Sequence, residues 1–314
     1  MQVYKNTGVE RWVIVNPAAG RGKVGRLSGA ILEAARRRGA KAFLTEGPGH
    51  ATLLAREAPP GARVVAVGGD GTVHEVLRGL AGTEKALGVV PIGSGNDFAR
   101  MLGLRGLPWP EALEHALLAP EEAVDLCRVN GEPFGASLGV GFDALVAKRS
   151  LSAPSFLRGM PRYLYALFAV LKDLRLPEGR VLLDGEEVYQ GPLLLLAAMN
   201  GPAYGGGIPI APMADPRDGL LSVVLARRFS RPGVVLILPR LLLGKHLSHP
   251  QVAAFAAREV EVAFPHPVPA HADGELLPET ATYRAAVEPL GLRVVGRRAG
   301  AKGKEPLLQP AGAS

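Results

Sequence analysis

The sequence contains little cysteine, few aromatic residues and no recognisable export signal. Among 314 residues there is one cysteine, Cys127, and aromatic side chains make up 5% of the chain. A single cysteine cannot form an intramolecular disulfide, which excludes a disulfide-stapled fold and suits a reducing compartment. The amino-terminal segment MQVYKNTGVERW lacks the apolar stretch of a signal peptide. We therefore expect a cytoplasmic protein.

Long hydrophobic runs are also missing. A long uncharged stretch that includes residues 191–214 is interrupted by Asn200-Gly201-Pro202 and again by three consecutive glycines at 205–207. The run VVLILP ends at Pro239. Because a helix needs about 20 consecutive apolar residues to cross a bilayer, we expect no membrane-spanning helix.

Charge is present in excess of one sign. There are 36 Lys and Arg against 29 Asp and Glu, which gives a net charge of +7. The positive charge can serve solubility alone, or it can attract nucleotides or the phosphate surface of a membrane, and both explanations fit equally well. We find no helix-turn-helix, zinc-ligand spacing or basic-aromatic ribbon, so nucleic acid is not an expected partner. Residues 299–314 are predicted to form a disordered basic tail.

Residues 1–125 alternate between short apolar runs and amphipathic segments. Strands are expected at 11–17, 41–46, 62–69 and 86–93, and helices at 27–39, 50–58, 73–80 and 110–119. This alternation is typical of a parallel sheet that is covered by helices on both faces. Functional sites in such sheets form at the carboxyl ends of the strands.

The pattern changes near Val124. Residues 126–289 carry hairpin signals at Asn130-Gly131 and Asp184-Gly185, several strand-like runs, and helical stretches at 160–174 and 232–246. These features predict an antiparallel, β-rich second domain of two packed sheets. The predicted fold class is therefore α/β, with an N-terminal nucleotide-binding domain built on a parallel sheet and a β-sandwich as the second domain.

Three glycine-rich polar loops follow three of the predicted strands. They occupy residues 16–23 (NPAAGRGK), 68–72 (GGDGT) and 91–100 (PIGSGNDFAR). Glycines let the backbone approach a ligand closely, and a helix N-terminus offers free N–H groups, so such loops suit phosphate. A dinucleotide fingerprint would need glycine in place of His74, and a Walker A loop would need glycine in place of Pro17, so neither motif fits.

Taken together, the three loops resemble those of the diacylglycerol-kinase-like lipid kinases, which include bacterial soluble lipid kinases and the sphingosine and ceramide kinases. The resemblance covers residues 11–296. It implies a first domain of residues 1–125, which the segment 290–298 rejoins, and a second domain of residues 126–289. The nucleotide would bind in the cleft between these two domains. The sequence Gly-Gly-Asp-Gly-Thr by itself is shared with NAD kinases and phosphofructokinases.

The resemblance also implies a set of nucleotide-binding residues. These are Asn16, Gly20, Arg21, Thr45, Gly68, Gly69, Asp70, Gly71, Thr72, Val73, His74, Ser94 and Asn96.

The segment HADGELL resembles the Asp-Gly-Glu motif of the same family. It implies that Glu275 is the general base and that Asp273 is its neighbour in the reacting centre. The alternative is a plain hairpin turn, because Asp-Gly is a strong turn dipeptide and occurs four times in this chain. For His271 a structural role is favoured over metal binding.

The segment IAPMADPRDGLLSV resembles the family's metal loop. By that resemblance, Asp218 would bind Mg²⁺ through its side chain, and Asp215 and Leu220 would offer carbonyl oxygens, which suit a hard ion. The alternative is another Asp-Gly turn before a strand.

The activity implied is magnesium- and ATP-dependent phosphoryl transfer to a lipid hydroxyl, with diacylglycerol or a related lipid as acceptor. Peripheral contact with the inner face of the membrane is expected through the helical residues 233–247. The alternative is that this helix packs on the β-sandwich. The sequence is also compatible with a homodimer. An NAD kinase is the nearest alternative, but the loop GSGNDFAR replaces its usual Asn-Glu pair. A non-catalytic nucleotide-binding regulator could dispense with Asp273-Gly274-Glu275, which is intact here.

Overall fold

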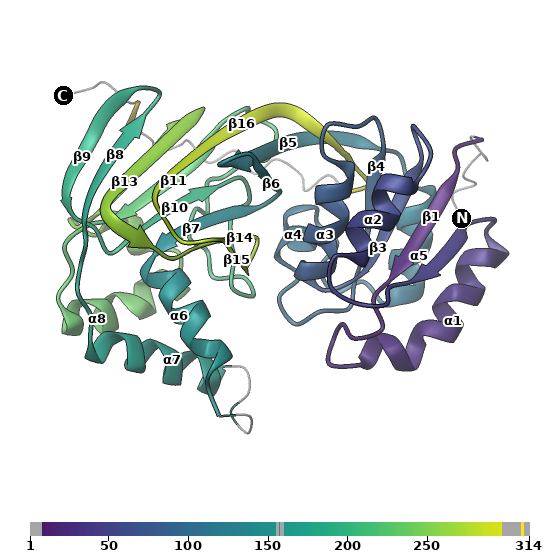
Figure 1. Cartoon of the computed structure of the whole chain (residues 1–314), viewed down its shortest axis with the longest axis horizontal. Coiled ribbons are helices and arrows are strands. Elements are labelled where there is room, and N and C mark those ends of the chain that lie inside the picture. Colours follow the sequence, from purple (N-terminus) through teal and green to yellow (C-terminus); the bar gives the residue numbers. More distant parts are fainter. Residues whose placement is uncertain (1–7, 155–156, 158–159, 297–308, 311–314) are drawn as a thin grey trace.

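The computed structural model describes residues 8–154, 157, 160–296 and 309–310, and shows two lobes joined by long strands (Figure 1). The predicted disordered tail, 299–314, lies outside the described residues except for Gln309–Pro310. These two form the short strand β17, which pairs with β12 (Val252–Ala257).

The first lobe is built on a parallel sheet. Its strands lie in the order β2 (Lys41–Leu44), β1 (Arg11–Val15), β3 (Arg63–Gly68) and β4 (Ala86–Pro91). All residues of β3 are buried, which explains the continuous apolar run from Val64 to Val67. Since β2 and β3 lie on opposite sides of β1, the strand order reverses between β1 and β3, where loops diverge and leave room for a ligand.

Helices cover both faces of this sheet. On one face, α1 (Lys23–Arg37) and α5 (Trp109–Leu118) share an apolar core with the strands. On the other face lie α2 (His50–Glu57), α3 (Asp70–Leu80) and α4 (Asp97–Met101). Three details differ from the prediction. Helix α1 begins at Lys23 instead of residue 27. Helix α3 begins inside the glycine-rich loop, because Gly69 serves as its N-cap, and α4 is one short turn without a detectable period.

The same sheet continues into the second lobe. The last residues of β16 (Thr280–Val294) pair in parallel with β4 on one side and antiparallel with β5 (Glu122–Val129) on the other. The earlier residues of β16 pair antiparallel with β5 and with β13 (Glu259–Val268). Figure 1 shows β16 and β5 running between the lobes. The sheet is completed by β6 (Glu132–Phe134), β8 (Glu178–Leu183) and β9 (Glu186–Pro192).

A second sheet packs against this extension. Its order is β15 (Glu275–Leu276), β14 (Ala270–Ala272), β7 (Ser137–Gly141), β10 (Leu195–Met199), β11 (Leu221–Ala226), β12 and β17. Side chains from both sheets form the core between them, including Phe134 and Tyr283 of the first sheet and Leu196 of the second. The predicted fold class, a parallel-sheet domain followed by a β-sandwich, is confirmed.

The outer face of the second sheet is covered by α6 (Phe142–Leu151), α7 (Met160–Lys172) and α8 (Arg231–Leu242), with the short 3₁₀ helix η1 (His246–Ser248) beside α8. The two predicted helices match α7 and α8. Helix α6 was not predicted, because the glycines of SLGVG precede it directly and no side chain caps its start. Within the described ranges, no helix is both long and apolar enough to cross a membrane.

Candidate active site

The three glycine-rich loops meet at the carboxyl end of the parallel sheet and pack backbone against backbone. A methyl group on Gly93 would lie 2.5 Å from the Cα atom of Gly69, and one on Gly20 would collide with the carbonyl oxygen of Ile92. Real side-chain atoms do not approach this closely. The glycines therefore let the second and third loops touch directly, and their backbone groups gather at one point.

We predict that Gly93→Ala pushes the second and third loops apart and weakens ATP binding at least about tenfold, because even a displacement of about 1 Å disturbs a phosphate cradle. Isothermal titration calorimetry measures the affinity. Gly29→Ala is the matched control: Gly29 lies in α1 with open space around it, so the added methyl meets nothing. Equal ATP affinity in Gly93→Ala and wild type would show that this loop contact does not contribute to ATP binding.

Asp70 organises the loops from inside. Its two carboxylate oxygens accept hydrogen bonds from the backbone N–H groups of Asn96 and Asp97, each at 2.7 Å. Burial raises the pKa of the Asp70 carboxyl, and the Asp97 charge adds to the rise, while the two N–H donors oppose it. The Asn96 side chain closes back on Gly93 through its Oδ1 and Nδ2 atoms. Asp70 thus fixes the start of α4 in place.

The first loop is tied to the second by a side-chain contact. Asn16 Nδ2 donates to Thr72 Oγ1 at 3.0 Å, and the Thr72 side chain lies directly over Gly68, where a methyl group would collide with it. The buried Thr45 follows β2, and its N–H donates to the carbonyl oxygen of Val15 just before Asn16.

The second lobe reaches the loops through a contact that the sequence analysis missed. Asp97 Oδ2 accepts from the Gly206 N–H at 2.8 Å, and Arg100 Nη2 donates to the Gly206 carbonyl oxygen at 3.0 Å. Burial raises the pKa of Asp97. In the sequence, the glycines at 205–207 only interrupt an uncharged stretch. They bring bare backbone against the third loop.

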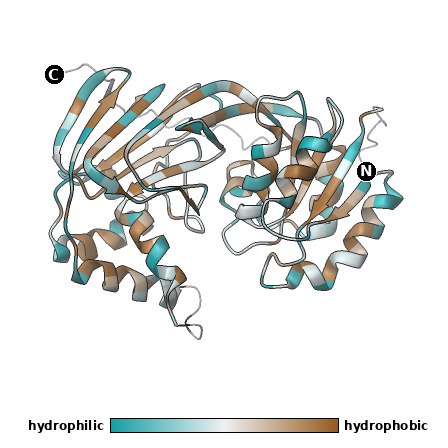
Figure 2. Cartoon of the chain, in the orientation of Figure 1, coloured by the Kyte–Doolittle hydropathy of each residue, from teal (hydrophilic) through white to brown (hydrophobic). Residues whose placement is uncertain are grey.

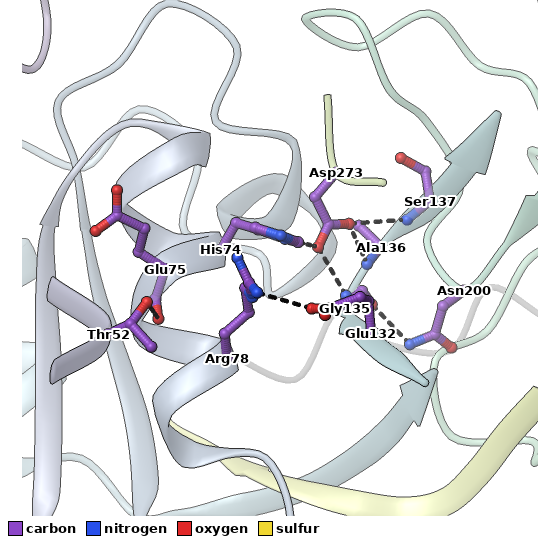
Figure 3. A network of polar contacts seen from close by, with 10 residues as sticks. All are labelled: Thr52, His74, Glu75, Arg78, Glu132, Gly135, Ala136, Ser137, Asn200 and Asp273. Atoms are coloured by element: carbon purple, nitrogen blue, oxygen red, sulfur yellow. Dashed lines mark hydrogen bonds and ion pairs between the residues drawn. The ribbon is translucent and has the colours of Figure 1, made fainter. Parts of the chain in front are cut away.

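Asp273 joins the two lobes at a second point (Figure 3). Its carboxylate accepts three backbone hydrogen bonds, from Gly135, Ala136 and Ser137 at 2.8–3.0 Å, and its Oδ2 atom lies 3.1 Å from His74 Nδ1 in α3. The Asp273 side chain is 8% exposed. Burial alone would raise the pKa of Asp273, but the bond and charge of His74, together with the backbone donors, hold it below its ordinary value.

His74 is the positive partner of this pair. Burial lowers the pKa of its imidazole, but the hydrogen bond and charge of Asp273 outweigh burial, and the net shift is upward, with Glu275 adding to the rise. Four residues later in α3, Arg78 pairs with Glu132 of β6 at 2.8 Å. One helix therefore contacts the second lobe twice (Figure 3).

Glu275 lies close to the second loop but is otherwise exposed. A methyl group on Gly71 would lie 2.7 Å from Glu275 Oε1, and the residue follows the Asp273-Gly274 turn between β14 and β15. Among the described residues no hydrogen-bond partner is found for its carboxylate. A carboxylate that is unoccupied and faces a glycine-rich loop at a helix N-terminus is placed to act on a ligand there.

Other predicted residues lie apart from this centre or serve it through the backbone. The Val73 side chain is buried in the apolar core, so any ligand contact would use its backbone, and Arg21 and Ser94 are exposed on the first and third loops. Glu75, which follows His74 in α3, accepts from the Ala51 N–H at the start of α2.

The predicted metal loop, which contains Asp215, Asp218 and Leu220, precedes β11 and contacts β5. Asp215 and Asp218 are exposed, and the loop's hydrogen bonds run to the buried Asp125, which accepts from the Gly219 N–H at 2.8 Å, rather than to the glycine-rich loops. The Nδ2 group of Asn200 donates to the carbonyl oxygens of both Asp125 and Gly135. The N–H group of Gly135 in turn donates to the Asp273 carboxylate. No cluster of three or more His, Cys, Asp or Glu side chains suited to a metal occurs among the described residues.

Comparison with known proteins agrees with this arrangement. The model of the diacylglycerol kinase catalytic domain matches residues 10–129, and that of the YegS C-terminal NAD kinase beta sandwich-like domain matches 136–296. The protein named diacylglycerol kinase in Mycobacterium tuberculosis is 33% identical over 296 residues, covering 91% of this chain and 95% of its own. The chain belongs to the diacylglycerol-kinase-like lipid kinase family.

Solved structures show the same fold in this family and beyond it. A diacylglycerol kinase from Bacillus anthracis superposes with a TM-score of 0.67 at 20% identity, covering 92% of this chain and 97% of its own. An NAD kinase from Archaeoglobus fulgidus in complex with ATP gives a TM-score of 0.54 at 15% identity, covering 92% and 94%. The lipid kinase family thus shares its two-domain architecture with NAD kinases.

Proposed function

We propose that this protein is an ATP-dependent kinase that transfers the γ-phosphate to the hydroxyl group of diacylglycerol or a related lipid, with Glu275 as the general base. The observation that carries the proposal is the approach of the Glu275 carboxylate to Gly71 in the second glycine-rich loop. Membership of the lipid kinase family, and the name of the M. tuberculosis relative, support the choice of acceptor.

Glu275 is preferred to Asp273 because their surroundings differ. The Asp273 carboxylate is occupied by three backbone donors and His74, and its pKa is lowered, so it is a poor proton acceptor. Asp184, in the other Asp-Gly-Glu sequence of this chain, is likewise held by the N–H groups of Arg258 and Glu259. An aspartate in this tripeptide can therefore anchor a hairpin turn without taking part in catalysis.

The reaction requires little covalent chemistry from the protein. The lipid oxygen attacks the γ-phosphorus, a new P–O bond forms, the bond to the β–γ bridging oxygen breaks, ADP leaves, and Glu275 takes the hydroxyl proton. The loop glycines bring N–H groups to the phosphates, and the N-terminus of α3 adds its partial positive charge. Positioning and electrostatics supply most of the rate in such transfers.

The direct test is incubation of the purified protein with labelled ATP, Mg²⁺ and separate acceptors: diacylglycerol, phosphatidylglycerol and a sphingoid base in vesicles, and NAD in solution. We expect label in a lipid product. Label in NAD alone would favour the soluble-substrate kinase that shares this fold. The absence of any labelled product, together with measurable ATP binding, would favour a non-catalytic regulator.

The residues of the metal loop fit a magnesium ion. Partial burial of the carboxyl group raises the pKa of Asp218, and the charges of Asp215 and Asp125 add to the rise, so negative charge accumulates where a cation would relieve it. We propose that the Asp218 carboxylate and the carbonyl oxygens of Asp215 and Leu220 hold Mg²⁺, a set of hard oxygen donors that suits this ion. The ion would fix the loop and, through Asp125 and Asn200, the strands behind Asp273.

We predict that Asp218→Ala removes most of the Mg²⁺-dependent rise in melting temperature, because an ion that binds only the folded state stabilises it by mass action. Thermal unfolding with and without Mg²⁺ measures the effect. Asp184→Ala, which also alters an Asp-Gly turn, is the control and should keep the wild-type shift. The same shift in Asp218→Ala and wild type would show that Asp218 is only a turn residue.

We also propose that α6, α7 and α8 contact an anionic membrane surface. Most of the exposed large apolar side chains among the described residues lie on this layer, including Leu236 at 76% and Phe168 at 54% exposure, and Figure 2 shows α7 and α8 as largely hydrophobic. The sequence has no Asp or Glu from 144 to 172 or from 219 to 258, while several Lys and Arg fall in both stretches. Apolar and basic groups on one face suit an anionic lipid surface.

Leu242→Glu in α8 is expected to weaken binding to phosphatidylglycerol vesicles at least about fivefold, because each charge near the surface contributes about 1 kcal/mol. Vesicle co-sedimentation, with phosphatidylcholine for comparison, measures this. Leu53→Glu in α2 is the matched control, since Leu53 and Leu242 are both 54% exposed. An equal loss of binding in both variants would contradict a membrane face on this layer.

A further inference from the structure

A second carboxylate–histidine contact lies on the other side of the β14–β15 hairpin, which carries Asp273 and Glu275. Asp143, in the first turn of α6, accepts at Oδ2 from the Tyr204 hydroxyl at 2.6 Å, and the same oxygen lies 3.1 Å from His271 Nε2. The Tyr204 and His271 rings meet edge to face with centroids 5.2 Å apart. The side chains of His271 and Asp143 are 5% and 12% exposed. Three polar groups from three separate segments thus converge beneath α6.

The backbone of β7 is shaped for this contact. A methyl group on Gly139 would lie 2.5 Å from His271 Nε2 and would collide with Asp143 Oδ2. Burial alone would raise the pKa of Asp143, but the bond and charge of His271 and the bond from Tyr204 outweigh it, and the net shift is downward. The group therefore stays a carboxylate against bare backbone.

Stability alone does not explain the cluster. The His271 Nδ1 atom is buried and has no hydrogen-bond partner in the part of the chain that the structure describes. A buried polar atom without a partner destabilises a fold, and an apolar pair of similar size would avoid that penalty. This points to a role that requires the polar contact itself.

The contact between His271 and Asp143 lies one cross-strand residue pair away from Glu275. In the β14–β15 hairpin, Ala272 pairs with Glu275 and His271 pairs with Leu276. Strand β15 is the two-residue edge of its sheet, so its place depends on β14. Helix α6 contacts both strands, and Lys148 of α6 also pairs with Glu279 just beyond them at 2.6 Å. Whatever fixes His271 against α6 therefore fixes the segment that carries Glu275.

We propose that Asp143, acting through His271, is a positioning residue that holds the β14–β15 hairpin so that the Glu275 carboxylate faces Gly71. This inference rests on the proposed role of Glu275 as the base. Asp273 anchors the turn from the side of α3, and Asp143 anchors the strand before it from the side of α6. Misplacement of a reacting group by about 1 Å can reduce a rate about 100-fold, so both anchors matter to turnover.

A double-mutant cycle on the full chain tests the inference. Asp143→Ala should lower kcat at least about tenfold while the KM for ATP stays unchanged, because the nucleotide loops lie in the other lobe. In a Glu275→Gln background the same change should have almost no further effect, since groups that act as a unit are not additive. Asp184→Ala is the control: it removes the acceptor that holds the other Asp-Gly-Glu turn, at β8–β9, and should leave kcat close to that of wild type.

A second pair of variants covers the case in which Asp143→Ala fails to fold. In His271→Gln the side-chain amide can still donate to Asp143, whereas His271→Leu has a similar size and cannot. We expect His271→Gln to retain most of kcat and His271→Leu to lose it. Additive effects in the cycle, or equal kcat in the two His271 variants, would overturn the positioning role. No effect of Glu275→Gln alone would instead overturn the proposed base.

Discussion

Glu275→Gln should lower kcat at least about 100-fold while ATP affinity stays unchanged, because general-base catalysis contributes about 10²–10⁴-fold. Glutamine keeps the size of the side chain but cannot accept the lipid's proton. Glu275 is exposed and comes from the second lobe, so its replacement leaves the packing of the glycine-rich loops intact. Single-turnover kinetics measure the chemical step, and calorimetry measures ATP binding.

The chain offers its own control for this substitution. Glu186 follows Asp184-Gly185 at the β8–β9 turn, in the same tripeptide as Asp273-Gly274-Glu275, and is also exposed. Glu186→Gln should therefore leave kcat at the wild-type value. If Glu275→Gln retained wild-type turnover as well, the Asp-Gly-Glu sequence at 273–275 would be a hairpin turn and the lipid hydroxyl would be activated elsewhere.

Asp273→Asn should reduce the free energy of unfolding by roughly 3 kcal/mol, because it breaks a buried charged pair and leaves donors without an acceptor. An amide has one oxygen where the carboxylate has two, and its NH₂ group would face backbone N–H groups. Among Gly135, Ala136, Ser137 and His74, some donors must then lose their partner. Urea unfolding measures the loss.

The pH dependence identifies the pair. Asp273 has a lowered pKa, so its contribution is present above the ordinary value of 3.8 and is lost as pH falls through the folded pKa. His74 has a raised pKa, so its contribution is present below 6.5 and is lost as pH rises through the folded pKa. The difference in stability between wild type and Asp273→Asn should therefore be greatest from about pH 4 to 6.5 and should shrink above that range.

Together the two substitutions separate the roles of neighbouring carboxylates. Glu275→Gln is expected to slow turnover without loss of stability, and Asp273→Asn is expected to lose stability and, through the displaced hairpin, turnover as well. An Asp273→Asn protein that unfolds like the wild type but does not turn over would reverse the assignment. Asp184→Asn, in the matching turn, should lose stability without loss of kcat per folded molecule.

The sequence by itself determined the elements that local patterns encode. Apolar runs fixed the parallel strands, glycine-rich segments at their ends marked the loops, and Asp-Gly dipeptides marked the hairpin turns. Each of these depends on a few consecutive residues, so no knowledge of distant contacts was needed. Helices α4 and α6 were missed because one is too short to show a period and the other begins among the glycines of a strand.

Only the tertiary structure decided which groups each carboxylate contacts. Asp184 and Asp273 have the same local sequence and nearly the same backbone, with φ of 50° and 51°, and the glycines that follow have φ of 86° and 88°. One turn nevertheless contacts the N–H groups of Arg258 and Glu259 at the start of β13, and the other contacts α3, β7 and the second glycine-rich loop. A side chain's pKa and its access to a ligand depend on groups that are distant in sequence. Identical tripeptides therefore acquire different roles only once the chain has folded.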